Sequence, residues 1–242
     1  MRLFPLAFLL AFAACDTVPV STGPAPSPGP AVPAIQPTAA GPKLSTRAAL
    51  SNYRSVVRRI EPVAEQFCRQ RAPRLNCDFR IVVDDRPGQP VNAYQTLDRN
   101  GRPIIAFTVP LIAEARSRDE IAFVMAHEAA HHIEGHIARQ RQNAALGAVL
   151  LGGLAGALGT TSPDAINTAQ QVGATVGARS YSKNFELEAD ALGTRIAAAA
   201  GYDPLRGAQF FFRIPDPGDK FLGTHPANAD RLRTVQQVAA SL

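Results

Sequence analysis

Four of the five histidines of this chain lie in one short stretch, VMAHEAAHHIEGH, at positions 124–136. His127 and His131 are four residues apart, so on a helix their imidazoles project from one face and converge on one point. Two converging imidazoles supply half of a tetrahedral zinc site, and the adjacent Glu128 can reach a water beside the metal without binding the metal itself. The spacing HExxH therefore predicts peptide hydrolysis, in which zinc activates water and Glu128 moves its proton to the leaving amine.

The third ligand of such a site must come from another part of the chain. The positions at which a metzincin carries its glycine and third histidine hold Glu134 and Ile137. The stretch FELEAD instead offers Glu186 and Asp190, which are four residues apart and share one helix face. We expect Glu186 to bind the metal and Asp190 to hydrogen-bond the outer nitrogen of a ligand histidine, which fixes its tautomer. Glu188 is the rival ligand, and a solvated, histidine-rich helix face is the alternative to a metal site.

One helix has to present the histidine pair. Ser117 and Glu120 have the spacing of a capping box, in which each side chain accepts a hydrogen bond from the backbone of the other residue. This pattern predicts a helix that begins there and runs through the histidines to about Gln142. On such a helix His132 and His136 face away from the ligand pair, so we expect them to be packing or surface residues.

The other expected elements follow from hydrophobic periodicity and turn residues. They are a helix over 46–70 with a possible break at Pro62, a strand over 77–85, a hairpin turn at 98–101, a strand over 103–109, a long helix over 177–200 ended by Gly201 and Pro204, and a short helix within 224–240. The chain is therefore predicted to be α+β and mostly α, with a small sheet beside the HExxH helix.

The segment Ala144–Leu158 is apolar but consists largely of small residues and glycine. Gly152 and Gly156 have the small-xxx-small spacing that is common between membrane helices. The uninterrupted stretch is shorter than the roughly 20 residues that a spanning helix needs. We therefore expect a buried or membrane-peripheral helical hairpin rather than a transmembrane helix.

The first residues, MRLFPLAFLLAFAAC, have the features of an export signal, with Arg2 before a short apolar run and small residues before Cys15. FAAC resembles a bacterial lipobox, so residues 1–14 are predicted to be a lipoprotein signal peptide and Cys15 a lipidation site. The alternative is an ordinary secretory signal with an incidental Cys15. Residues 15–43, rich in proline and alanine, predict a tether, and residues 44–242 the folded domain. We expect a location in the bacterial cell envelope, lipid-anchored to a membrane and facing the periplasm.

Export also affects the two remaining cysteines. Cys68 and Cys77 are close enough in sequence to close a small loop, and disulfides persist outside the cytosol. We expect a structural disulfide, with two reduced buried thiols as the alternative.

The composition is that of a globular protein, with 46% hydrophobic and 19% charged residues. A net charge of +5 and a pI near 9.5 could suit an anionic membrane or a nucleic acid. The arginines are scattered and are not interleaved with aromatic residues, so no nucleic-acid partner is predicted.

Three motifs in order, HEAAHHIEGH, SKNFELEADALG and THPANADR, resemble those of zinc-peptidase family M48, which includes the HtpX heat-shock protease, the CAAX prenyl protease and BepA-type periplasmic proteases. The resemblance covers residues 44–242. It implies a gluzincin-type domain with one Zn²⁺ per chain, bound by His127, His131 and Glu186, with Glu128 as the base.

The resemblance also implies further site residues. VNAYQ is similar to the segment before the strand at the family's active-site edge, so IIAFT is expected to pair with a substrate peptide by β-augmentation. The substrate-binding residues implied in this way are Asn92, Ala93, Ile105, Ala106 and Phe107. The pattern HPxxxxR implies His225 and Arg231 as groups that stabilise the transition state. The alternative is a loop histidine and a solvated arginine.

These features together predict a zinc-dependent endopeptidase of the cell envelope that cleaves unfolded or misassembled envelope proteins. Its expected partners are protein or peptide substrates, a membrane reached through the lipid, and envelope-assembly proteins. The alternative is a zinc-binding envelope scaffold or chaperone-like factor with little proteolysis, although a pure scaffold would not need Glu128.

Overall fold

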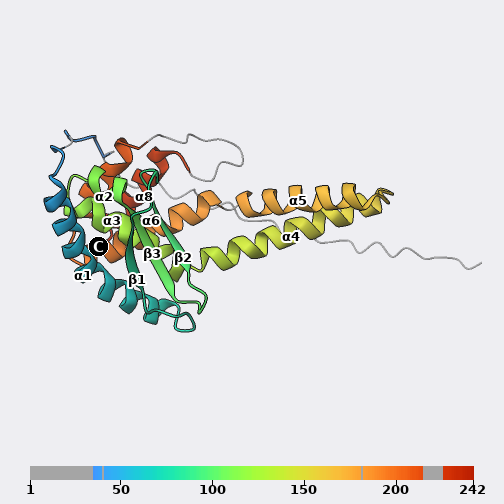
Figure 1. The fold of residues 1–242 in the computed structure, drawn as a ribbon, viewed down its shortest axis with the longest axis horizontal. Coiled ribbons are helices and arrows are strands. Elements are labelled where there is room, and N and C mark those ends of the chain that lie inside the picture. Colours follow the sequence, from blue (N-terminus) through green and yellow to red (C-terminus); the bar gives the residue numbers. More distant parts are fainter. Residues whose placement is uncertain (1–34, 40, 181, 215–225) are drawn as a thin grey trace, which may run out of the picture. The chain divides into compact units, whose positions relative to one another are not determined.

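The computed structural model describes residues 35–39, 41–180, 182–214 and 226–242. Within these residues the protein is mostly helical, with one small three-stranded sheet (Figure 1). The fold is therefore of the predicted α+β class, and its sheet lies beside the helix that carries the HExxH residues. The predicted signal peptide, Cys15 and most of the predicted tether lie outside the described residues.

Helix α1 spans Thr46–Arg71, and the Ser45 side chain accepts a hydrogen bond from Ala48 N at its start. One face of α1 is buried in the core and carries residues at helical spacing, among them Ile60 and Ala64. Pro62 lies inside this helix and does not end it, so the break considered from the sequence is absent. Burial of the same face on both sides of the exposed proline offsets the loss of one backbone hydrogen bond.

The sheet consists of β1 (Arg80–Asp84), β2 (Ala93–Leu97) and β3 (Pro103–Thr108) in the order β1-β3-β2. Strand β3 pairs with β1 in parallel and with β2 antiparallel. The β2–β3 connection is the predicted turn at 98–101, in which the Asp98 carboxylate accepts hydrogen bonds from Asn100 N and Arg102 N.

The strand predicted to pair with a substrate, IIAFT, is the central strand of this sheet. Both of its backbone edges are hydrogen-bonded, and Ile105, Ala106 and Phe107 are buried. The assignment of these three residues to substrate binding is therefore wrong, because β-augmentation requires a free edge. The edge strand on the antiparallel side is β2.

A short helix, α2 (Val109–Glu114), follows β3 directly and was not predicted from the sequence. Helix α3 spans Arg118–Ile133. The Ser117 hydroxyl accepts from Glu120 N, as the capping box requires. The Glu120 carboxylate, however, accepts from Arg116 N instead of Ser117 N, and it also pairs with Arg213. Only half of the predicted capping box is thus formed, because the glutamate binds the preceding residue and a distant arginine.

The predicted helix from Ser117 to about Gln142 is two helices. Helix α3 ends at Ile133, and Gly135 has a left-handed conformation (φ +67°) before α4 (His136–Ala157) begins. Glycine adopts this conformation without the steric cost that a side chain brings. The break changes the direction in which the His136 side chain points. The expectation that His136 lies on the opposite side of one straight helix from His127 is therefore wrong.

Helix α5 (Pro163–Ser180) packs along α4, and the two lie side by side in Figure 1. Helix α6 spans Ser182–Ala199, so the predicted long helix from residue 177 is divided between α5 and α6. Helices α4 and α5 each pack mainly against the other. The apolar segment 144–158 thus lies in one arm of a helical hairpin, and its exposed leucines show that the buried alternative is wrong. No helix within the described residues is both long and apolar enough to cross a bilayer.

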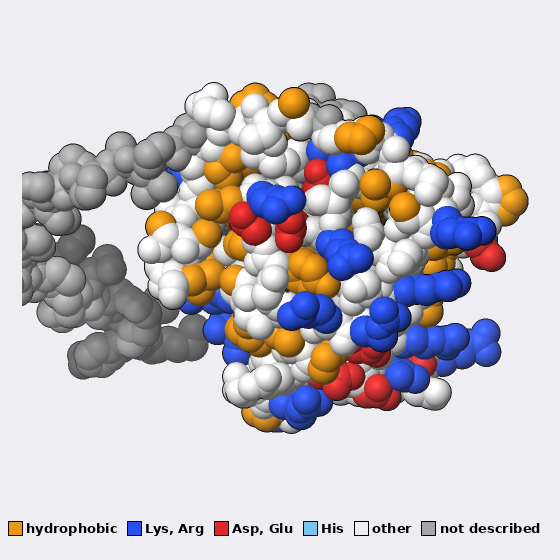
Figure 2. All heavy atoms as spheres, turned by 90° about the vertical axis from the view of Figure 1, so that its left-hand side faces the viewer, with side chains coloured by type: hydrophobic (Ala, Val, Ile, Leu, Met, Phe, Trp, Pro, Cys, Tyr) orange, Lys and Arg blue, Asp and Glu red, His pale blue; other side chains and the backbone are white. Residues whose placement is uncertain are grey.

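The C-terminal part adds α7 (Pro204–Gly207), a 3₁₀ turn (Ala208–Phe212) and α8 (Asn228–Ala239). Helix α3 is at the centre of the fold, where it packs against α1, α6 and the sheet. A Cβ atom on Gly193 of α6 would lie 3.0 Å from the Cα atom of His127, so a glycine there allows α6 to approach α3 closely. On the face shown in Figure 2, basic side chains are interspersed with acidic and hydrophobic ones.

Candidate metal centre

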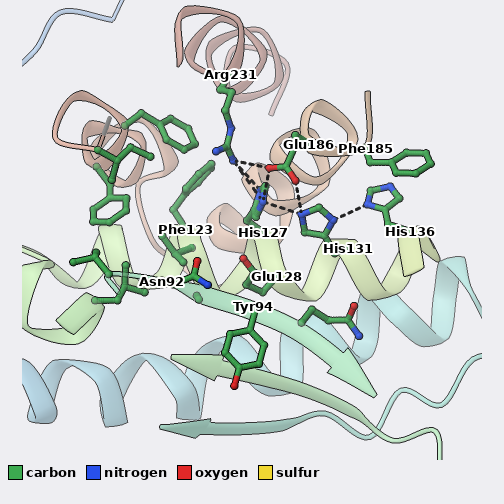
Figure 3. A pocket seen from close by; sticks show the side chains of 18 of the residues that line it. Asn92, Tyr94, Phe123, His127, Glu128, His131, His136, Phe185, Glu186 and Arg231 are labelled. Carbon is green, nitrogen blue, oxygen red and sulfur yellow. Dashed lines mark hydrogen bonds and ion pairs between the residues drawn. The ribbon is translucent and has the colours of Figure 1, made fainter. Parts of the chain in front are cut away.

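One group of histidine and carboxylate side chains within the described residues has converging ligand atoms, and it consists of His127, His131 and Glu186. The two histidine Nε2 atoms are 3.0 Å apart. Glu186 Oε2 lies 3.5 Å from His127 Nε2, and Glu186 Oε1 lies 3.4 Å from His131 Nε2. In Figure 3 the three side chains point toward one another, with both histidines on α3 and Glu186 on α6.

This triangle of ligand atoms fits a zinc ion. Bonds of about 2.0–2.1 Å in a tetrahedral site place ligand atoms about 3.3–3.4 Å apart. Two imidazole nitrogens and one carboxylate oxygen are also the donors of many catalytic zinc sites, in which the fourth position is left for water. Both the spacing and the chemistry of the donor atoms therefore suit zinc.

Asp190 orients the first histidine. Its Oδ1 atom lies 2.9 Å from His127 Nδ1, and the carboxylate is fully buried. A carboxylate only accepts hydrogen bonds, so His127 donates its Nδ1 proton to Asp190, and a bound metal would take the place of a proton on Nε2. Burial lowers the pKa of His127, but hydrogen bonds and the charge of Asp190 raise it more, to about 10. The site thus favours positive charge, which a divalent ion can supply while the imidazole stays neutral.

Arg231 of α8 holds Asp190 in turn. Its Nε and Nη2 atoms each donate to one Asp190 oxygen at 2.7 Å, and its guanidinium lies 4.0 Å from the Phe211 ring centre. Burial raises the pKa of Asp190, but the positive charge of Arg231 lowers it by more, so the pKa of Asp190 is below its usual range. Arg231 Nη2 also lies 3.7 Å from Glu186 Oε2. The residue is buried at the site, so the alternative of a solvated arginine is wrong.

A second chain of contacts, not predicted from the sequence, orients the other histidine. His131 Nδ1 lies 2.8 Å from His136 Nδ1, and His136 Nε2 lies 3.1 Å from Glu188 Oε2. Glu188 accepts from His136 Nε2, so His136 Nδ1 is the acceptor for His131 Nδ1–H. His131 Nε2 is therefore left with a lone pair that faces the other ligands.

The same contacts correct two expectations. Glu188, the rival ligand, is bound to His136 and to Arg139 and is not a member of the ligand triangle. His136 is buried against the Phe185 ring, and burial lowers its pKa to about 4. The sequence signal for this arrangement is Gly135, a residue type typical of helix C-terminal ends.

His132, by contrast, is a packing residue as expected. It is buried, its Nε2 atom lies 2.8 Å from Asn76 O, and its ring contacts Phe79 edge-on. Asn76 precedes Cys77, which forms a disulfide with Cys68 in the structure. His132 and the disulfide thus join α3, α1 and the start of the sheet.

Glu128 lines a cavity of about 780 Å³ together with the three candidate ligands. Figure 3 shows its carboxyl group beside His127, on the side of Asn92 and Tyr94. The cavity also has an apolar part, and the residues that form it are Val91, Leu111, Phe123, Val124, Phe210, Phe211 and Ile214. Asn92 and Ala93, the other two residues predicted to bind substrate, line the cavity, and so do Tyr94 and Gln95 of the edge strand β2. His225 lies outside the described residues.

Comparison with known proteins gives the following matches. The model of peptidase family M48 matches residues 51–239. A protein of Vibrio cholerae assigned as a beta-barrel assembly-enhancing protease is 35% identical over 150 residues, which are 56% of this chain and 30% of that protein. The beta-barrel assembly-enhancing protease of Yersinia pestis is 30% identical over 183 residues, 66% of this chain and 34% of that protein. The mitochondrial metalloendopeptidase OMA1 of Arabidopsis thaliana is 30% identical over 138 residues, 55% of this chain and 27% of that protein.

The chain spans about a third or less of the length of these curated relatives. No solved structure gives a significant match. The family model extends over the sheet and both helices that carry the candidate ligands. The motifs, the ligand geometry and this match agree, and the chain belongs to peptidase family M48.

Proposed function

We propose that this protein is a zinc-dependent endopeptidase that cleaves unfolded or misassembled proteins of the bacterial cell envelope. The observation that carries the proposal is the convergence of His127, His131 and Glu186 beside Glu128 in one cavity. His127, His131 and Glu186 would bind one zinc ion, which when bound supplies the Lewis acid that activates water and polarises the scissile carbonyl.

The chain's own residues account for the proton transfers. Glu128 lies next to the ligands in the cavity and is half-buried, so its carboxylate can accept a proton from water and deliver it to the leaving amine. Asp190 and the neutral His136 hold the two ligand histidines in the tautomer with Nε2 free. Arg231 places positive charge near Glu186, where it would stabilise the developing oxyanion together with His225.

The substrate would bind in an extended conformation along β2. This strand is at the edge of the sheet, and Ala93, Tyr94 and Gln95 line the cavity. Backbone hydrogen bonds to an edge strand do not depend on the substrate sequence, and the apolar part of the cavity suits side chains that folded proteins bury. Both features favour unfolded segments as substrates.

The envelope location rests on three observations. Two of the relatives are named as beta-barrel assembly-enhancing proteases. The Cys68–Cys77 disulfide suits an oxidising compartment. Residues 1–14 have the pattern of a lipoprotein signal, so we propose lipid attachment at Cys15 and a tether over 15–43. Envelope-assembly proteins would then be neighbours and partners of the enzyme.

The experiment compares wild type, Glu128→Gln and Glu134→Gln for digestion of casein, with the zinc content of each protein measured in parallel. Glu134 is the residue directly after the same helix and pairs with Arg71 outside the cavity, so its replacement is the matched control. We expect Glu128→Gln to keep zinc and lose about 10²–10⁴-fold in cleavage rate. Glu134→Gln should cleave like wild type.

The outcome also separates an enzyme from a zinc-binding scaffold. If wild type and Glu128→Gln both hold zinc and neither cleaves casein, nor other unfolded proteins, under several conditions, the endopeptidase proposal is wrong. Equal cleavage by wild type and Glu128→Gln would instead remove Glu128 from the mechanism.

A further inference from the structure

Large hydrophobic side chains on the surface are concentrated on helix α4. Leu146, Val149, Leu150, Leu154 and Leu158 run along α4 and the residue after it, and they are between 54% and 78% exposed. Isolated exposed leucines are ordinary on protein surfaces, but a continuous apolar stripe along one helix marks an interaction surface.

The reason for this exposure is the packing between α4 and α5. A Cβ atom on Gly147 would lie 2.0 Å from Gly173 O, and one on Gly177 would lie 2.1 Å from Asn143 O. The two backbones are therefore in direct contact through glycines, and most of the large apolar side chains of α4 point outward. Small residues between helices and large apolar residues outside are the pattern of helices that face lipid.

The charges of the hairpin are arranged to match a membrane surface. Between Arg141 and Arg179 the only charged residue in the sequence is Asp164. Because Gly177 contacts Asn143, Arg141 and Arg179 lie at the same end of the helix pair, and both are exposed. Basic side chains at the end of an apolar helix suit the phosphate groups of anionic lipids.

The two helices also differ in polarity. The exposed residues of α5 include two valines, Val172 and Val176, beside several polar uncharged side chains, whereas the large side chains that α4 exposes are mostly leucines. The polar side chains are Asn167, Thr168, Gln171 and Thr175. The α4 side of the hairpin is thus the more apolar one, and the α5 side the more polar one.

We propose that the α4–α5 hairpin binds the surface of a lipid bilayer, with α4 lying in the boundary between headgroups and acyl chains. A flat orientation places the whole apolar stripe in the acyl region, while Arg141 and Arg179 at one end and Asp164 at the other stay among the headgroups. This contact is separate from the proposed lipid at Cys15 and independent of catalysis. It would hold the peptidase domain close to the membrane in a fixed orientation.

The test uses the full chain, which has no tryptophan, so that an introduced tryptophan is the sole reporter. Leu150→Trp places it on the α4 stripe, and Leu75→Trp places it on an exposed leucine outside the hairpin as the matched control. Each protein is mixed with phosphatidylcholine/phosphatidylglycerol vesicles that contain brominated acyl chains, which quench tryptophan only at short range. Whether or not residues 1–34 also reach the bilayer, quenching at position 150 reports on the hairpin alone.

We expect Trp at position 150 to shift to shorter emission wavelength and to be quenched at least twofold, while Trp at position 75 changes little. Replacing Arg141 and Arg179 by glutamine in the Leu150→Trp protein should weaken this response on vesicles that contain phosphatidylglycerol. The proposal is overturned if Trp at position 150 is not quenched, or if both positions are quenched equally. A blue shift without vesicles that grows with protein concentration would also overturn it, because the stripe would then bind a second copy of the chain.

Discussion

Two neighbouring regions of the molecule distribute their side chains in opposite ways. One region consists of helices α3 and α6. The other is the α4–α5 hairpin, which follows α3 after Gly135 and leads into α6. In α3 and α6, Glu120, His127 and Asp190 are buried and each has a charged or hydrogen-bonding partner. In the hairpin most large apolar side chains of α4 are exposed, and glycines bring the two backbones into contact. A buried polar site requires a partner for each of its polar groups. A hairpin of the proposed lipid-facing kind requires close contact between its two helix backbones.

The largest difference between the two regions should appear when a carboxylate is removed from each. Asp190→Asn leaves the buried Arg231 without its closest ionised partner, and we expect a loss of about 3–5 kcal/mol in the free energy of unfolding. Asp164→Asn removes an exposed charge of the hairpin and should change this free energy by less than about 0.5 kcal/mol. Urea unfolding followed by circular dichroism measures both, and equal midpoints for Asp190→Asn and wild type would contradict the role of the buried pair.

Zinc should stabilise one region and not the other. Ligands that bind only the folded state stabilise it by about 2.7 kcal/mol at a free concentration about 100-fold above Kd. We expect added zinc to protect backbone amides of α3 and α6 from hydrogen exchange by an amount of this order. Amides in the middle of α4, which packs against α5 and not against the ligands, should exchange at an unchanged rate. Equal protection of α4 would mean that the hairpin and the metal centre unfold together.

A matched pair of histidines tests the contact at the junction of the two regions. His136→Ala removes the acceptor for His131 Nδ1 and should weaken zinc binding by about 10–100-fold, the range for residues that orient a metal ligand. His132→Ala removes a buried packing residue that touches no ligand, so it should lower stability and leave zinc affinity unchanged. Competition with a chromophoric chelator gives both affinities. Unchanged affinity in His136→Ala would show that His131 does not depend on this contact.

The smallest effect is expected from two glycines of the hairpin. Gly147→Ala forces a Cβ atom into the α5 backbone and should speed hydrogen exchange in α4 by the equivalent of about 1–2 kcal/mol. Gly153→Ala meets no atom within 4 Å and should slow exchange slightly, because alanine favours helix by up to about 1 kcal/mol. Neither change should alter zinc affinity. The same exchange rates in both variants would mean that α4 and α5 are not held together through Gly147.

Much of the metal centre could be predicted from the sequence because helix geometry is regular. Residues four apart share a face, so His127 with His131, and Glu186 with Asp190, could be paired before any coordinates were known. His136 could not be placed in this way, because the left-handed Gly135 changes the direction of the chain. The helix face of a residue after Gly135 can therefore no longer be calculated from its distance in sequence to His127. The position of a motif on a helix is thus predictable only up to the next break.

The fold could be predicted to a similar extent, and the prediction failed for a related reason. The two predicted strands, the hairpin turn and the first helix follow local patterns, and the structure contains them, whereas β2 was not predicted as a strand. The order of the strands depends on long-range pairing, which no local pattern reports, so β3 could not be recognised as the central strand. The exposure of the α4 leucines likewise depends on how α5 packs, which glycines at 147, 173 and 177 decide together.

The most direct test of the account is the zinc affinity of wild type, Glu186→Gln and Glu188→Gln, measured with the same chelator. The two glutamates are two residues apart on α6, but only Glu186 reaches both ligand histidines, while Glu188 pairs with His136 and Arg139. We predict one zinc per wild-type chain, a loss of more than about 100-fold in affinity for Glu186→Gln, and about tenfold or less for Glu188→Gln. Wild-type affinity in Glu186→Gln, with loss of zinc in Glu188→Gln, would contradict the proposed ligand set.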